Sequence, residues 1–232
     1  PLYSQIARYH KSSGYARFVF TAEDRYKAGK VAHPSIEFVN PYTDDAMMWL
    51  TKELQWETVA EKHTMFPAYI RFLPLKRRKE AEEGVKKQNG NWKNIMNLPV
   101  LKEKRFLRFC PECAKEDREK YGEAYWHRVH QIPRVNVCLK HKVYLEHSSI
   151  IISSKASPGL YDAQSCIHET PTARQCENER EIFFTKYVEA VFNSPIDFET
   201  DFYVGDYLQA RISKNYKNKS GLMCSVSKFY DD

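Results

Sequence analysis

The chain has 232 residues, of which 42% are hydrophobic and 14% aromatic. This content can bury a sizeable core, so it excludes a wholly disordered protein and allows one large domain or two small ones. Thirty-six Lys and Arg residues against 30 Asp and Glu residues give a net charge of +6. The excess is concentrated in residues 71–105, where 11 basic and four acidic residues give a local +7 and leave −1 for the remainder.

The sequence contains no segment that predicts membrane insertion. No apolar run reaches the roughly 18–20 residues that a spanning helix needs, and the N-terminus lacks the basic and apolar regions of a secretion signal. We therefore expect a cytoplasmic protein without membrane contact. Because the chain begins at Pro1 and stops at Asp232 in a polar-aromatic stretch, we also expect a fragment of a longer protein.

In the N-terminal part, the spacing of apolar residues predicts short helices. The first is expected to begin at Ser4 as N-cap and to stop at Gly14. Residues 15–40, in which Gly29 and Pro34 interrupt the apolar residues, are expected to be mostly loop or short elements. Thr43 precedes a helical period in which Met47, Leu50 and Leu54 share one face.

Two further helices, over residues 57–64 and 74–88, complete a predicted helical domain of helix-turn-helix type over residues 1–105. The last of them carries four consecutive basic residues, 76–79, in its first turns, where the helix dipole disfavours cations. This placement indicates an anionic partner. The alternative is a solvated helix, since Glu82 and Glu83 each precede a lysine by four residues.

Four potential metal ligands form two knuckles between residues 106 and 150. Cys110 and Cys113 are separated by two residues, 24 residues follow, and Cys138 and His141 are again separated by two. Three sulfurs and one imidazole at this spacing predict one tetrahedral zinc site. Because four protein ligands leave no open position, the zinc would be structural and not catalytic. The alternatives are buried apolar cysteines, or a redox pair with Cys138 unrelated.

Other potential ligands are less well spaced. Cys166, His168 and Cys176 leave a second metal site open, with loop or core cysteines as the default interpretation. His127 and His130 lie between the knuckles and are expected to be hydrogen-bonded packing residues.

Residues 151–232 are expected to form a linker followed by helical segments. Apolar periodicity predicts a helix from Ile182 that ends near residues 193–195. The residues after Tyr207 could open a second helix-turn-helix.

Several of these segments together resemble the TnsD/TniQ family of transposition target-selection proteins. The resemblance rests on both knuckles, on residues 121–133 between them, on the opening residues 2–8 and on residues 64–69. It covers residue 2 to about 150 and is thin afterwards. Two positions depart from the family pattern: Arg134 stands where the family often has Gly, and Leu139 where it often has Pro.

The resemblance implies a mainly α protein with a helix-turn-helix domain and a zinc-ribbon or zinc-finger module. The zinc ligands would be Cys110, Cys113, Cys138 and His141. It also implies a non-catalytic protein of the bacterial cytoplasm, associated with the nucleoid. Such a protein binds double-stranded DNA at the transposon attachment site and recruits TnsC, an AAA+ ATPase.

The long basic region favours the TnsD type, which binds DNA directly. The expected phosphate contacts are basic side chains of this region: Arg71, Lys76, Arg77, Arg78, Lys79, Arg105 and Arg108. The alternative is a TniQ-type adaptor that docks on a CRISPR effector complex. A more distant alternative is a zinc-containing HNH-like nuclease, suggested by His130 and Asn136 between the knuckles.

Overall fold

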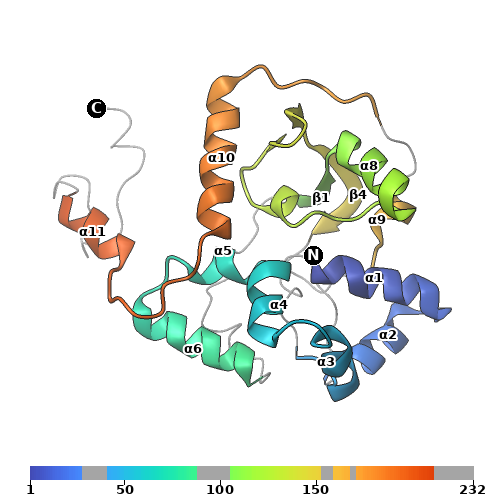
Figure 1. The fold of residues 1–232 in the computed structure, drawn as a ribbon, viewed down its shortest axis with the longest axis horizontal. Coiled ribbons are helices and arrows are strands. Elements are labelled where there is room, and N and C mark those ends of the chain that lie inside the picture. Colours follow the sequence, from blue (N-terminus) through green and yellow to red (C-terminus); the bar gives the residue numbers. More distant parts are fainter. Residues whose placement is uncertain (28–40, 88–104, 153–158, 168–170, 212–232) are drawn as a thin grey trace.

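A computed structural model describes residues 1–27, 41–87, 105–152, 159–167 and 171–211. Figure 1 shows the N-terminal helices along one side of the molecule and the metal-ligand knuckles with their strands on the other. The mainly α architecture predicted from the sequence is confirmed, with two small antiparallel sheets added. None of the described helices is long and apolar enough to cross a membrane.

Six helices lie in the described residues of the N-terminal part. They are α1 (Leu2–Ser13), α2 (Phe18–Arg25), α3 (Asp44–Leu50), α4 (Trp56–His63), α5 (Phe66–Ile70) and α6 (Leu75–Lys86), and those from α3 to α6 follow one another after short connections. Gly14 ends α1 in the left-handed conformation as predicted, and α3 begins after Thr43, whose side chain caps it. The prediction that Leu54 shares the face of this helix is wrong, because α3 ends at Leu50 and Leu54 is 41% exposed beyond it. The predicted N-cap at Ser4 is wrong, because α1 begins at Leu2 and the Ser4 side chain is buried where the helix meets Trp126.

The knuckle region is a small mixed unit. Strand β1 (Arg105–Phe109) leads into helix α8 (Pro111–Tyr121), followed by the short 3₁₀ helix η2 (Val129–Gln131). Strands β2 (Val137–Cys138) and β3 (Val143–Tyr144) form a tight hairpin, and β4 (Glu146–Ile152) returns antiparallel to β1. The sequence analysis did not predict these strands, because pieces of two to seven residues carry almost no periodicity of their own.

The C-terminal part packs back onto both regions. Helix α9 (Ala163–Cys166) is one turn long, and α10 (Glu179–Asn193), capped by Asn178, is the helix predicted from Ile182. Helix α11 (Val204–Arg211) follows. The predicted second helix-turn-helix after Tyr207 lies mostly outside the described residues.

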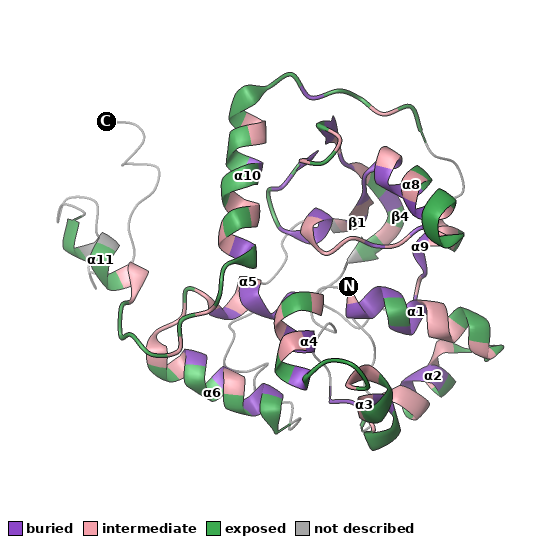
Figure 2. Cartoon of the chain, in the orientation of Figure 1, coloured by how far each residue is buried: buried purple, intermediate pink, exposed green. Residues whose placement is uncertain are grey.

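One continuous hydrophobic core joins the N-terminal helices to the knuckle region (Figure 2). Trp126, which is 0% exposed, donates its backbone N–H to Ser4 Oγ over 3.2 Å and its indole N–H to the Tyr161 carbonyl over 2.7 Å. The Tyr161 N–H in turn reaches the Tyr3 hydroxyl at 3.0 Å. Residues before and after residue 105 therefore contribute to one hydrophobic core. The domain boundary at residue 105 stays a prediction.

Arg134 has a left-handed backbone with φ 70°. This conformation explains the glycine that the family often has there, since a side chain at positive φ costs about 1 kcal/mol. The Arg134 side chain is exposed, so it recovers little of that cost through packing.

We predict that Arg134→Gly raises the free energy of unfolding by about 0.5 to 1 kcal/mol, because it removes this backbone strain. Urea denaturation of the two proteins side by side measures the change. A glycine variant that is less stable than the parent would show that the strain is absent or is outweighed by contacts of the arginine.

Candidate metal centre

The four predicted ligands meet at one point. Their ligand atoms all lie within 4.8 Å of one another, although 24 residues separate the two knuckles. His141 Nδ1 lies 3.4 Å from Cys110 Sγ, 3.4 Å from Cys113 Sγ and 3.8 Å from Cys138 Sγ. The sulfurs of Cys113 and Cys138 are 3.7 Å apart.

These separations match the edges of a coordination tetrahedron. Metal bonds of about 2.3 Å to sulfur and 2.0 Å to nitrogen give sulfur–sulfur edges of about 3.8 Å and sulfur–nitrogen edges of about 3.5 Å. The cluster can therefore hold a tetrahedral ion without moving its side chains far. Of the described residues, no other group of three or more His, Cys, Asp and Glu side chains converges in this way.

Local structure explains how each knuckle aims its ligands. Cys110 is the N-cap of α8, and its sulfur accepts the Cys113 backbone N–H over 3.4 Å. Pro111 occupies the first turn, where its missing N–H costs nothing. In the second knuckle, the turn between β2 and β3 contains His141 and is closed by Lys142, whose φ is 53° and whose N–H donates to the Cys138 carbonyl over 2.8 Å.

The electrostatics of the cluster also favour a cation. Hydrogen bonding with Cys110 raises the pKa of the Cys113 thiol, whereas hydrogen bonds from Cys110 and Cys113 lower the pKa of the Cys138 thiol. Three crowded sulfurs cannot all ionise beside one another without a compensating charge. A bound divalent cation supplies that charge and lets all three act as thiolate ligands.

Glu116 on α8 orients the imidazole ligand. Its Oε1 lies 3.0 Å from His141 Nε2, which leaves Nδ1 directed at the cluster, and its other oxygen pairs with Lys140. A hydrogen bond from Lys140, followed by one from His141, lowers the pKa of the Glu116 carboxyl group. Sequence analysis did not identify Glu116, because its position three residues after Cys113 has no significance until the second knuckle is folded against α8.

His127 is hydrogen-bonded, as predicted, whereas His130 is packed in the core with its Nδ1 lacking a hydrogen-bond partner among the described residues. His127 Nε2 lies 2.7 Å from Asp117 Oδ2, and its ring centroid is 4.9 Å from that of His130. His130 is buried and lies against the Cys138 sulfur. A buried histidine beside four better-placed ligands does not resemble the accessible metal-binding histidine that an HNH nuclease requires.

A second metal site is not formed by the described residues. Cys166 lies in α9 and Cys176 follows an isolated bridge to β3, and neither belongs to a group of metal-binding side chains. His168, the third residue of that hypothesis, lies outside the described residues.

Arg128 joins the metal-ligand region to the helices around it. Its guanidinium donates to the carbonyls of Glu61 (2.5 Å) and Thr64 (3.2 Å) at the end of α4, and to Asn193 Oδ1 of α10 (2.8 Å). It also lies 4.4 Å from the centroid of the Phe192 ring. Burial lowers the pKa of Arg128 to about 10, which still leaves it charged at neutral pH.

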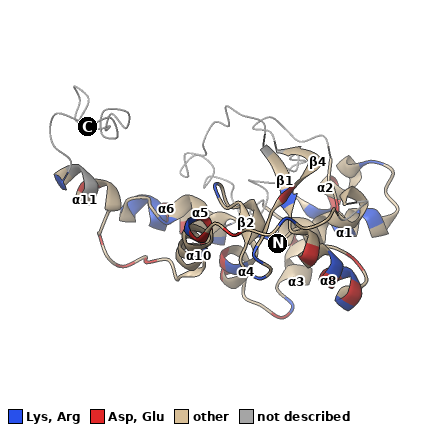
Figure 3. Ribbon diagram, turned by 90° about the horizontal axis from the view of Figure 1, so that it is seen from above, with Lys and Arg blue, Asp and Glu red and all other residues tan. Residues whose placement is uncertain are grey.

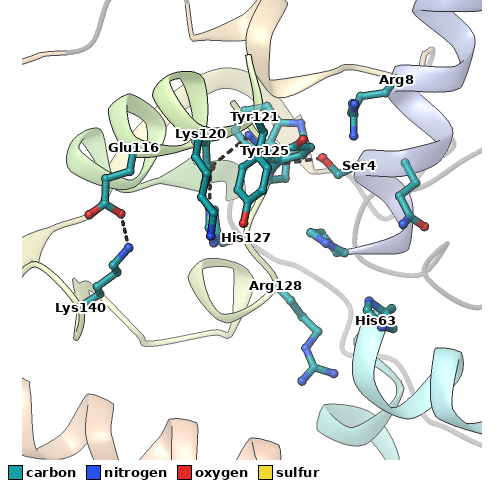
Figure 4. Close-up of a pocket in the computed structure, with 14 residues that line it drawn as sticks. Ser4, Arg8, His63, Glu116, Lys120, Tyr121, Tyr125, His127, Arg128 and Lys140 are labelled. Atoms are coloured by element: carbon teal, nitrogen blue, oxygen red, sulfur yellow. Dashed lines mark hydrogen bonds and ion pairs between the residues drawn. The ribbon is translucent and has the colours of Figure 1, made fainter. Parts of the chain in front are cut away.

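A pocket of about 540 Å³ lies beside Arg128, between α1, α4 and α8 (Figure 4). Three of its charged groups are paired within the chain: Arg8 with Glu123, Lys140 with Glu116, and His127 with Asp117. Lys120, also in the lining, is exposed and lies 5.0 Å from the centroid of the Tyr121 ring. The pocket is therefore a polar junction between helices in which most charges are paired.

The seven predicted DNA-contacting residues lie in three kinds of place. Three arginines bind carbonyls of the chain itself: Arg71 those of Phe192, Ser194 and Pro195, Arg78 those of Asp197 and Thr200, and Arg108 those of Ile132 and Val135. The others on α6 face solvent, with Lys76 and Lys79 exposed and Arg77 half-buried. Arg105 begins β1. Figure 3 marks the positions of basic residues along the ribbon of α6 in blue.

Comparison with known proteins places these features in one family. The family model described as TniQ matches residues 1–145, a range that contains the metal centre and α6. The chain is also 34% identical over 84 residues to the Transposon Tn7 transposition protein TnsD of Escherichia coli. That alignment covers 34% of this chain and 16% of the relative, so the chain spans only a small part of that protein's length.

Glu116→Gln should lower the affinity for Zn²⁺ or Co²⁺ by about tenfold, because the amide is a weaker acceptor for the imidazole N–H. Competition with a chromophoric chelator measures this affinity. Glu119→Gln, three residues further along the same helix and exposed, is the matched control. Equal affinities for both variants would contradict the orienting role.

Arg128→Met should lower the free energy of unfolding by about 2 kcal/mol, since it leaves the carbonyls at the end of α4 without their charged donor. Denaturant unfolding measures the decrease. Arg180→Met, at an exposed position of α10, should be nearly neutral. A similar small effect in both variants would show that Arg128 does not join the two regions.

Proposed function

Because the chain belongs to the TniQ family, we propose that it selects the target site for a Tn7-like transposon. In this proposal it binds duplex DNA at the attachment site and recruits the AAA+ ATPase TnsC. The observation that carries the proposal is the family match over residues 1–145, which includes both the metal centre and the basic helix α6. The similarity to TnsD of E. coli supports it further.

Zinc is the ion that suits the metal centre, because three thiolates and one imidazole form the soft tetrahedral set that this metal prefers. With four protein ligands the ion has no position for water or substrate. We therefore infer a structural role for the metal and a non-catalytic role for the protein. The ion would hold α8 and the β2–β3 hairpin together. It would thereby stabilise the segment from which Trp126 contacts α1 and Arg128 contacts α4.

Helix α6 is the element best placed to contact DNA phosphates. Lys76 and Lys79 are exposed, and of the residues that the structure describes none forms an ion pair with them. Further along the same helix, Lys86 pairs with Glu82 (2.9 Å) and Lys87 with Glu83 (3.2 Å). The first turns of α6 therefore carry the available positive charge, and its last turn is neutralised.

One observation favours the second candidate, a TniQ-type adaptor that reaches DNA through a CRISPR effector complex. The guanidinium groups of Arg71, Arg78 and Arg108 bind carbonyls of the chain itself, which reduces the number of phosphate contacts below the seven expected from the sequence. Footprinting of the full-length protein on candidate attachment-site DNA, without CRISPR components, separates the two. Sequence-selective protection supports direct binding, and its absence supports the adaptor.

We expect the double variant Lys76→Ala/Lys79→Ala to weaken DNA binding at every sequence. The slope of log affinity against log salt should become shallower by about two, since each phosphate that a lysine neutralises contributes about 0.9 to it. The matched control is Lys86→Ala/Lys87→Ala, which removes the same charge from the same helix where acids already neutralise it. Fluorescence anisotropy over a salt series measures both. Equal effects of the two double variants would contradict a specific role for the first turns of α6.

A further inference from the structure

An apolar groove runs between α5 and α10 and is closed at one end by the loop after η2. It encloses about 390 Å³, and none of its lining residues is a carboxylate. Side chains of α5 and the turn after it form one wall, and side chains of α10 form the other, including Met65, Tyr69, Phe72, Tyr187 and Val191. The volume lies within the range of roughly 300–1,000 Å³ found for ligand-binding clefts.

The walls of the groove continue onto the surface as exposed apolar side chains. Phe72 is 56% exposed on one wall and Tyr187 is 63% exposed on the other. Helical spacing places Phe184 and Val191 on the same face of α10 as Tyr187. Contiguous exposed apolar surface beside a cavity is characteristic of an interaction site. Figure 2 shows that much of α10 is exposed.

Cations border this apolar surface. Arg134 is exposed and directly follows Pro133, which lines the groove. Arg180 is exposed on α10 and lies on the face of Phe184 and Tyr187, four and seven residues before them. The backbone of Arg134 is strained, with φ 70°, and a glycine at this position would remove the strain. An arginine kept in a strained conformation points to a function for its side chain.

The construction of the walls limits the kind of occupant. Both walls are built on helices, and neither presents the extended edge with which an added strand could pair. Recognition must then rest on side chains, as when an amphipathic helix lays its apolar face into a groove. The basic border and the lack of lining carboxylates select a helix whose polar positions are acidic.

We propose that the groove between α5 and α10 binds an amphipathic helix of a partner protein, with apolar residues in the groove and carboxylates beside Arg134 and Arg180. This surface is distinct from the first turns of α6, where Lys76 and Lys79 point to solvent. The proposal does not depend on DNA binding, because it concerns only the contact between this groove and a partner protein.

The test uses the full chain and a fluorescein-labelled synthetic peptide with Leu at helical positions i, i+3, i+4 and i+7 and Glu elsewhere. Binding is measured by anisotropy. The peptide should bind about tenfold more tightly than the same peptide with Lys in place of Glu. Tyr187→Ala should weaken binding by about tenfold. Phe183→Ala is the matched control, because Phe183 is 73% exposed on the same helix but does not line the groove.

Arg134→Gly distinguishes a loss of peptide binding from a loss of folding stability, because the two should change in opposite directions. It should weaken peptide binding by about threefold, as expected for a charge at the border of an interface, while the protein itself becomes more stable. DNA affinity should be unchanged in all of these variants. Equal binding of the Glu and Lys peptides, or equal effects of Tyr187→Ala and Phe183→Ala, would overturn the proposal. So would self-association that the Tyr187 variant abolishes, since the groove would then bind a second copy.

Discussion

The convergence of three sulfurs and one imidazole at a single point is the constraint on which the rest of the structure depends. The ligands come from the start of α8 and from the turn of the β2–β3 hairpin, two short elements with little core of their own. Structural zinc contributes on the order of 10 kcal/mol to such units, which is comparable with the stability of a whole domain. An ion at this point therefore fixes α8 against the hairpin, and the contacts outside the cluster build on that unit.

The consequences of this constraint reach the N-terminal helices through a few buried contacts. Trp126 follows α8 and packs against α1, where its backbone N–H meets Ser4. Arg128 then connects the same segment to the end of α4 and to α10. A change at the metal centre should consequently disturb α1, α4 and α10 together, and with them the basic helix α6 and the groove beside α10. In the proposed function, a bound metal would act only through this shared framework.

Sequence reasoning was most successful where spacing alone determines chemistry. The two knuckles identified all four ligands, and helical periodicity with capping residues identified α1, α3, α4, α6 and α10. It missed the strands and the helices α5, α8 and α9. It also missed the orienting role of Glu116 and the contacts of Arg128 with α4 and α10, because both depend on partners distant in the chain. Counting basic residues also did not reveal that Arg71, Arg78 and Arg108 are used to hold backbone carbonyls, since an internal and a DNA-facing arginine look alike in sequence.

X-ray absorption spectroscopy at the zinc edge tests the central claim most directly, on protein purified without added metal and with its zinc content determined by elemental analysis. The account predicts one zinc per chain, with three sulfur neighbours at about 2.3 Å and one nitrogen at about 2.0 Å. A folded protein with far less than one zinc per chain would contradict the account. A first shell of oxygen and nitrogen neighbours without sulfur would contradict it equally.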